Sequence, residues 1–380
     1  MKKFSAFLIF SVILAALHTD CFAISAQSAA AIDAASGRVL FSQDCDRKMG
    51  MASTTKIMTA ICALESADVN SVATVSKQAY GVEGSSMYLV LGEKLTLENL
   101  LYGLMLVSGN DAATAVAEHV SGSVDKFAEL MNKKAAEIGA YDSSFTNPHG
   151  LADKNHYTTA HDLAKITAYA LKNPKFAEIV STKTKSIPWK DHDYNRRLVN
   201  HNKFLSMYDG CIGVKTGFTK ATGRCLVTAV DRGGMRVVCV TLNAPDDWND
   251  HKSIYDSIFS EYKPCLLKSG SEAAATAEIK GGSAKSVTLV PESDIYLPLK
   301  DGEEGSLEMS AEAFEDLHAP VSKGDVLGKL SVKINGAECG EFPLVASENV
   351  EMKTVRLRPE SGSFGLSLKK VFYLWITCFN

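Results

Sequence analysis

The sequence lacks the features that mark several common classes of protein. It has no long run of one charge. Its 40 Lys and Arg residues nearly balance 44 Asp and Glu residues, for a formal net charge of -4. Binding to a polyanion needs a concentrated positive surface, so nucleic-acid binding is not expected. No internal repeat of the solenoid kind is present. With 380 residues and 46% hydrophobic content, the chain is long enough for two globular domains of about 150 residues each.

Nine cysteines are present, but no two of them form a C-x-x-C pair and none clusters with histidine along the sequence. This spacing predicts no zinc site. Cys62 and Cys239 lie inside apolar stretches, where a small buried side chain is the expected role of a cysteine. Disulfide pairing is left open, because spacing alone does not define it.

The apolar run near the N-terminus, Phe4 to Leu17, is shorter than the ~20 residues of a membrane-spanning helix. It follows two lysines and precedes the small residues of CFAISAQSA. This order is typical of a secretory signal peptide, so residues 1–23 are predicted to be a signal, with cleavage after Ala23 or Ala26. An uncleaved membrane anchor and a lipoprotein signal at Cys21 are the alternatives.

Strand and helix patterns follow one another along the rest of the chain. AAIDAASGRVLFSQ predicts a β-hairpin with its turn at Ser36-Gly37, and a helical pattern runs from Ser53 to about Leu171. Strand patterns return in GCIGVKTGFT, RCLVTAVD and MRVVCVTL, and a last helix follows. The order predicts an α+β domain over residues 24–265. Its antiparallel sheet would take strands from both ends of the domain, with the helical region inserted between them.

Beyond about Lys268 the composition shifts to Gly, Ser, Ala and acidic residues, in KSGSEAAATAEIKGGSAKS. Short alternating segments such as KLSVKING and EFPLVAS come next. Residues 272–355 are therefore predicted to form a small all-β domain.

The C-terminal tail, residues 363–380, is predicted to be an amphipathic helix. Its apolar face consists of Phe364, Leu368, Val371, Phe372, Trp375 and Phe379. The apolar part is too short to cross a bilayer, which takes ~20 residues, but suffices to lie in its interface, where Trp, Tyr and Lys side chains are favourable. The tail is therefore predicted to anchor the protein to a membrane surface; a helix packed on the β domain or on a partner is the alternative.

A short motif, MASTTKIMTA, carries the first indication of chemistry. It places Ser53 three residues before Lys56, on one face of a helix. A serine hydroxyl becomes a nucleophile when a neighbouring base takes its proton, and a neutral lysine is such a base. The spacing alone is not specific, because Ser-x-x-Lys also occurs at Ser123/Lys126, Ser260/Lys263 and Ser367/Lys370.

Two further motifs follow in the chain, Ser108-Gly109-Asn110 after a helical stretch and Lys215-Thr216-Gly217 in a predicted strand. In this order the three motifs closely resemble those of the serine D-alanyl-D-alanine carboxypeptidases, the low-molecular-mass penicillin-binding proteins. NPHGL at 147–151, the extension of the third motif to Thr219, and APVSKGDVLGKLSVKINGAECGEFPLVA at 319–346 resemble the same family.

The resemblance implies a β-lactamase/transpeptidase-like fold for the first domain. It also implies an exported hydrolase that removes the terminal D-alanine from peptidoglycan stem pentapeptides through an acyl-enzyme. Such an enzyme binds β-lactams as inhibitors and needs no metal or organic cofactor. Its expected location is the outer face of the cytoplasmic membrane, near the cell wall.

The resemblance also assigns roles to the motif residues. Ser53 is the expected nucleophile and Lys56 its base, while Ser108 would pass the proton to the leaving amine and Asn110 would hold the Lys56 amine and the substrate amide. Burial and the nearby Lys215 cation would both lower the pKa of Lys56 and so help to keep it neutral.

The third motif is expected to bind the substrate. Lys215, Thr216 and Thr219 would face its terminal carboxylate, with Gly217 between them in the motif. The oxyanion hole is expected at the backbone amides of Ser53 and Phe218.

Two alternatives remain for the function: a β-lactamase, which shares the motifs, and a sensor or wall-binding protein that is acylated without turnover. The second domain, the tail and the absence of Glu-x-x-Leu-Asn after Ser108 disfavour the β-lactamase. His149 and His161 are expected to be structural. Some members of the family add an arginine beyond the last core strand to grip the carboxylate, but APDDWNDHKS offers only His251 and Lys252 there.

Overall fold

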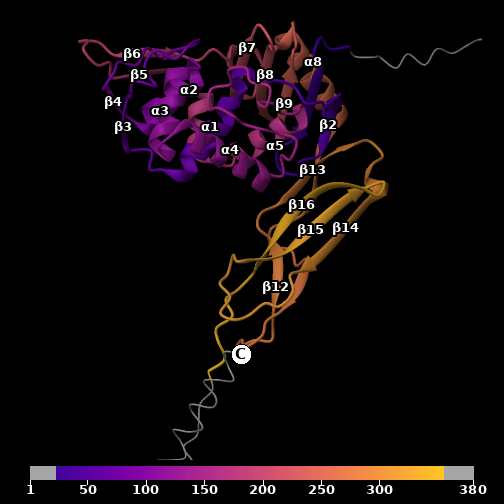
Figure 1. Cartoon of the computed structure of the whole chain (residues 1–380). Coiled ribbons are helices and arrows are strands. Elements are labelled where there is room, and N and C mark those ends of the chain that lie inside the picture. The colour runs from indigo at the N-terminus through magenta and orange to yellow at the C-terminus, as the bar shows by residue number, and fades with distance from the viewer. Residues whose placement is uncertain (1–22, 355–380) are drawn as a thin grey trace, which may run out of the picture. The chain divides into compact units, whose positions relative to one another are not determined.

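The computed structural model describes residues 23–354 (Figure 1). The predicted signal peptide up to residue 22 and the predicted membrane tail lie outside the described residues. The chain divides into two compact units between Glu261 and Tyr262, and each unit is described by itself below.

The first unit contains a five-stranded antiparallel sheet in the order β2-β1-β9-β8-β7. The strands are β1 (Ser28–Asp33), β2 (Val39–Gln43), β7 (Cys211–Thr219), β8 (Gly223–Arg232) and β9 (Met235–Leu242). The predicted hairpin is present as β1 and β2, and β1 pairs along its whole length with β9. The sheet is thus completed by strands from the two ends of the unit, which confirms the predicted α+β arrangement.

Helices from the inserted region lie beside this sheet (Figure 1). They are α1 (Lys56–Ser66), α2 (Leu97–Leu106), α3 (Asn110–Ser121), α4 (Val124–Ile138), α5 (Ala160–Ala170) and α6 (Pro174–Ser181), followed by α7 (Phe204–Met207) and α8 (Asp247–Glu261). All residues of α1 from Lys56 to Ala63 are buried. Ser123 caps α4 by accepting a hydrogen bond from the backbone N–H of Lys126, so this copy of Ser-x-x-Lys is a helix start.

The predicted helical run from Ser53 to Leu171 is wrong in two stretches: residues 139–159, between α4 and α5, contain no helix, and neither does the stretch between α1 and α2. Strands β3 (Val72–Thr74) and β4 (Lys94–Thr96) form a two-stranded sheet, and the residues between them are irregular. Buried carboxylates and backbone groups hold this segment, so its shape depends on contacts distant in sequence. A second small sheet, β5 (Thr184–Ile187) with β6 (Arg196–Val199), was likewise not predicted.

The second unit is built from strands, as predicted for an all-β domain. β10 (Tyr262–Lys268) pairs with β13 (Ile295–Lys300). A five-stranded sheet has the order β11-β12-β16-β15-β14, with β11 (Ala275–Glu278), β12 (Ser286–Pro291), β14 (Leu307–Ala313), β15 (Val326–Ile334) and β16 (Ala337–Ala346). Ala277, Leu289, Leu297, Val332 and Leu344 are the fully buried residues of its core. Among residues 23–354, no helix combines the length and apolarity needed to cross a membrane.

Candidate active site

Ser53 lies in a short 3-10 turn, η1 (Ala52–Thr55), immediately before α1. Two glycines let other backbone segments approach this turn closely. A Cβ atom on Gly217 of β7 would lie 3.1 Å from the backbone nitrogen of Ser53. A Cβ on Gly150, which has a φ of +88°, would overlap the carbonyl of Ala52. The turn is therefore held between the sheet edge and the NPHGL segment, which fixes where the Ser53 hydroxyl points.

The amine of Lys56 is fully buried and lies at the centre of three polar contacts. Lys56 Nζ is 2.9 Å from Ser53 Oγ and 2.7 Å from Asn110 Oδ1. It is also 2.6 Å from the backbone carbonyl oxygen of His149. Three segments that are far apart in sequence thus meet at one nitrogen atom.

Both lysines of the site have lowered pKa values. Burial is the largest cause for Lys56, and the charge of Lys215 lowers its pKa further, while Asp111 acts in the opposite direction. Burial lowers the pKa of Lys215 to about 7. A low-dielectric surrounding disfavours the charged form of an amine, so the site shifts Lys56 toward its neutral form.

The second motif occupies the junction between α2 and α3. Ser108 is buried there with a φ of +61°, and Asn110 begins α3. The side-chain amide of Asn110 donates to the carbonyl of Glu83 at 2.6 Å, so its oxygen is the atom that faces Lys56. The structure therefore brings Asn110 into direct contact with the Lys56 amine.

The third motif lies on β7, the edge strand of the sheet. Lys215 is buried and donates to the carbonyl of Thr216 at 2.8 Å. Because side chains alternate along a strand, Thr216 and Phe218 lie on the face opposite Lys215, and Phe218 is 65% exposed. Thr219 Oγ1 is 2.9 Å from Thr222 Oγ1 in the turn to β8. An edge strand leaves backbone N–H and C=O groups free for a ligand.

The histidines near the motifs have structural contacts. Burial, and then the charge of Lys56, lower the pKa of His149 to about 4. His161 lies in the first turn of α5 with its Nδ1 3.2 Å from Asp46. His251 is fully buried between Thr228 and Thr241, and burial lowers its pKa to about 3, so it offers no cation to a substrate carboxylate.

Two features of the site were not found from the sequence. The backbone carbonyl of His149 contacts Lys56, although NPHGL was noted only as a point of resemblance. Asp111 is a buried carboxylate next to Asn110 that accepts hydrogen bonds from the backbone of Met87 and Leu89. A charged residue directly after the motif, at the start of an Ala-rich helix, was the signal that could have identified Asp111.

One group of side chains in the described part of the chain has the composition of a metal site. Ligand atoms of Cys45, Asp46 and His161 lie within 4.8 Å of one another. Hydrogen bonds from the thiol and the imidazole to the carboxylate account for this grouping. None of the three is a motif residue.

Comparison with known proteins identifies the family. The family model described as D-alanyl-D-alanine carboxypeptidase matches residues 15–246, and that described as the C-terminal domain of penicillin-binding protein 5 matches residues 262–352. D-alanyl-D-alanine carboxypeptidase DacF of Bacillus subtilis is 32% identical over 343 residues, which cover 88% of each chain. DacA of Haemophilus influenzae is 30% identical over 90% of this chain and 87% of its own.

Solved structures agree with this result. Penicillin-binding protein 5 of Haemophilus influenzae has a TM-score of 0.68 at 28% identity, covering 87% of this chain and 98% of that one. PBP3 of Streptococcus pneumoniae, described as a peptidoglycan synthesis regulatory factor, has a TM-score of 0.70 at 25% identity and covers 87% of this chain. The fold and motifs define a serine penicillin-binding protein of low molecular mass. The chain belongs to the D-alanyl-D-alanine carboxypeptidase family.

We expect Lys215→Gln to move the pH dependence of acylation by penicillin. Lys56 is the expected acceptor of the Ser53 proton, and its protonated form cannot take that proton, so we expect acylation to be lost as pH falls through the Lys56 pKa. The Lys215 cation lowers that pKa, and its removal raises it. In a plot of the acylation rate against pH, the acidic limb should therefore shift to higher pH. Stopped-flow or mass spectrometry of the adduct measures this rate. Lys252→Gln, on the exposed side of α8, is the control. A limb that stays in place, or moves to lower pH, would contradict the coupling.

Proposed function

We propose that Ser53 is the nucleophile and Lys56 the general base of this serine D-alanyl-D-alanine carboxypeptidase. The geometry at the Lys56 nitrogen carries the proposal. A neutral amine has two N–H groups and one lone pair. Asn110 Oδ1 and the carbonyl of His149 accept the two N–H groups, which leaves the lone pair for the Ser53 hydroxyl at 2.9 Å. Neutral Lys56, with its lone pair directed at the Ser53 hydroxyl, thus meets the two requirements of a general base.

The reaction then proceeds in two steps. Ser53 Oγ attacks the carbonyl carbon of the penultimate D-alanine while its proton passes to Lys56, and the backbone amides of Ser53 and Phe218 stabilise the oxyanion. The C–N bond breaks, and Ser108 relays a proton to the leaving amine of the terminal D-alanine. A water molecule then attacks the ester, its proton returns to Ser53 Oγ, and the shortened peptide leaves with a new carboxylate.

Recognition of a free carboxylate explains why the enzyme removes a terminal residue. Lys215 with Thr216 and Thr219 is proposed to bind that carboxylate. In the empty site, burial lowers the pKa of Lys215 to about 7. A bound anion favours the ammonium form, so substrate binding is expected to charge Lys215. A peptide amide at the same position would provide no such charge.

The substrate is proposed to be the stem peptide of peptidoglycan ending in D-Ala-D-Ala, and the site of action lies outside the cytoplasm. β-Lactams are the expected inhibitors, because they acylate the same serine. A β-lactamase remains the second candidate, as does an acylated sensor without turnover. The relatives that match most of this chain are named carboxypeptidases, which favours the first assignment.

Ser53→Ala is expected to abolish covalent labelling by penicillin and to lower the release of D-alanine from diacetyl-Lys-D-Ala-D-Ala by at least ~10³-fold, because no other group then forms the acyl-enzyme. Ser53 lies in the η1 turn before α1 and its hydroxyl caps no helix, so circular dichroism and the melting temperature should change little. Ser123→Ala, at the look-alike motif, should leave catalysis intact. Persistent labelling in Ser53→Ala would overturn the assignment, and fast penicillin turnover by the native protein without D-alanine release would favour a β-lactamase.

The C-terminal tail is proposed to hold the enzyme on the outer face of the cytoplasmic membrane. This rests on the sequence pattern of residues 363–380, which lie outside the described residues. Burial of four or five of the apolar side chains at ~1.5–3 kcal/mol each would suffice for interfacial binding, and Lys369 and Lys370 add attraction to anionic lipid.

Deletion of residues 363–380 from the signal-cleaved protein should move it from the membrane pellet to the soluble fraction. D-Alanine release from a soluble peptide should stay within about twofold of the native rate, because the catalytic motifs lie in another unit of the chain. Fractionation and a D-amino-acid assay measure the two outcomes. A truncated protein that still sediments with membranes, or that loses activity on the soluble peptide, would assign the tail another role.

A further inference from the structure

We propose that the buried ion pair of Glu93 with Arg196 is a positioning device, which fixes the segment 81–93 so that this segment orients the Asn110 side chain toward Lys56. The proposal rests on the proposed function, in which Asn110 holds the catalytic amine. It assigns a role in the reaction to two residues that lie outside the three motifs.

The segment meets the active site through its backbone. Asn110 Nδ2 donates to the carbonyl of Glu83 at 2.6 Å, and the backbone N–H of Asn110 donates to the carbonyl of Ser85 at 2.7 Å. Gly84 lies between these two carbonyls with a φ of +96°, and a Cβ there would be 2.7 Å from Asn110 Nδ2. A carboxamide is planar, so holding its nitrogen fixes the direction of its oxygen. That oxygen is the one that contacts Lys56 at 2.7 Å.

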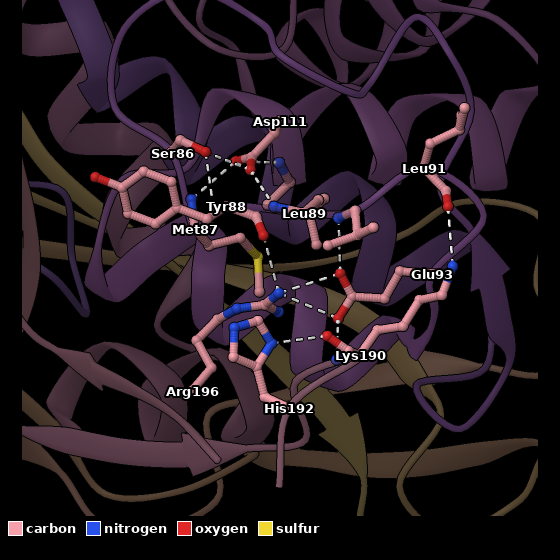
Figure 2. Close-up of polar contacts among 12 residues, drawn as sticks. Ser86, Met87, Tyr88, Leu89, Leu91, Glu93, Asp111, Lys190, His192 and Arg196 are labelled. Carbon is pink, nitrogen blue, oxygen red and sulfur yellow. Dashed lines mark hydrogen bonds and ion pairs between the residues drawn. The ribbon is translucent and has the colours of Figure 1, made fainter. Parts of the chain in front are cut away.

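The ion pair holds the far end of the same segment, as Figure 2 shows. Arg196 Nη2 lies 3.1 Å from each carboxylate oxygen of Glu93 and donates to the carbonyl of Tyr88 at 3.0 Å. Glu93 Oε2 also accepts from the backbone N–H of Val90 at 2.9 Å. The two side chains are only 2% and 4% exposed. Because Arg196 belongs to β6, the pair ties the irregular segment to a strand about 100 residues further along the chain.

Asp111, the neighbour of Asn110 in the sequence, holds the middle of the segment, as Figure 2 shows for its contacts with residues 86–89. Its carboxylate accepts hydrogen bonds from Ser86 Oγ at 2.6 Å, from the Met87 N–H at 3.1 Å and from the Leu89 N–H at 3.0 Å. The contacts therefore form a continuous path. It runs from Arg196 through the backbone of residues 88–90 to Asp111, and through residues 83–85 to the side chain of Asn110.

The loop between β5 and β6 also contacts the ion pair and its segment. The ring of Trp189 lies 5.0 Å from the Arg196 guanidinium, and Lys190 Nζ donates to the carbonyl of Leu91 at 3.1 Å. A buried ion pair is a poor source of stability, because its desolvation offsets the attraction and an apolar pair often serves as well. An ion pair can also hydrogen-bond to backbone groups, which an apolar pair cannot do. Here Arg196 and Glu93 form such bonds with Tyr88 and Val90, in the segment that contacts Asn110.

A double-mutant cycle tests whether the pair acts through Asn110. Glu93→Leu with Arg196→Met removes both charges at similar volume and leaves neither charge unpaired. The kcat/KM for D-alanine release should fall about tenfold or more in the native background, and by less than about twofold in the Asn110→Ala background. Penicillin acylation followed by mass spectrometry extends the cycle to slow variants. An equal loss in both backgrounds would mean a purely structural role, and no loss in the native background would mean that the pair does not position the segment. Either result overturns the proposal.

A conservative variant of Arg196 and a control variant at another ion pair complete the test. Among the described residues, Nε and Nη1 of Arg196 have no hydrogen-bond partner, so a single nitrogen makes all of its polar contacts. A lysine ammonium has three donors, and Arg196→Lys should therefore keep kcat/KM within about threefold. Arg236→Met removes a more exposed pair with Asp231 at the β8–β9 turn and should change nothing.

Glu93→Gln provides a milder form of the same cycle if the double variant does not fold. It keeps the hydrogen bond from Val90 but removes the charge. Its loss of kcat/KM should therefore be smaller than that of the double variant, and it should also vanish in the Asn110→Ala background. Activity that persists in Ser53→Ala would refute the proposed function, whereas a failed cycle with an inactive Ser53→Ala variant would refute only the positioning role.

Discussion

Burial of the Lys56 amine beside Ser53 is the constraint on which the rest of the site depends. An ammonium ion in a dry interior is unfavourable unless it is paired, and no carboxylate contacts Lys56 directly among the described residues. The amine therefore favours its neutral form, which is the form a base requires. Lys215, buried nearby, adds to this preference. Burial is thus the main physical reason why the lysine that begins α1 has a lowered pKa.

The fold serves this constraint by bringing distant segments to one nitrogen. The carbonyl of His149 comes from a turn, Asn110 from the start of α3, and Ser53 from the turn before α1. The edge strand β7 approaches the same turn through Gly217, and Gly150 approaches it from the other side. Small residues are needed where backbones meet, and the sheet edge provides free backbone groups beside the nucleophile. Segment 81–93 then determines how the Asn110 carboxamide is turned.

Sequence predicted those features whose signal is local. The hairpin of β1 and β2, the strands β7 to β9 and the all-β second unit all follow from alternation and turns, and the motifs indicated Ser53, Lys56 and Asn110 by their order. It did not predict the carbonyl of His149, because a backbone group has no residue signature. Nor did it predict the irregular segment before β4, whose shape depends on Asp111 and on an ion pair with a residue of β6. The copy at Ser123 had the right spacing but serves as a helix cap.

Direct titration of the Lys56 amine tests the central claim most closely. Lysine labelled with carbon-13 at Cε reports the charge of each amine through its chemical shift, and the Lys56→Gln variant identifies the signal. The account predicts that Lys56 titrates well below the ordinary lysine value of 10.5 and that its pKa rises in Lys215→Gln. A Lys56 signal that remains that of an ammonium ion up to pH 10.5 would contradict the account, because such a group would not take the proton of Ser53.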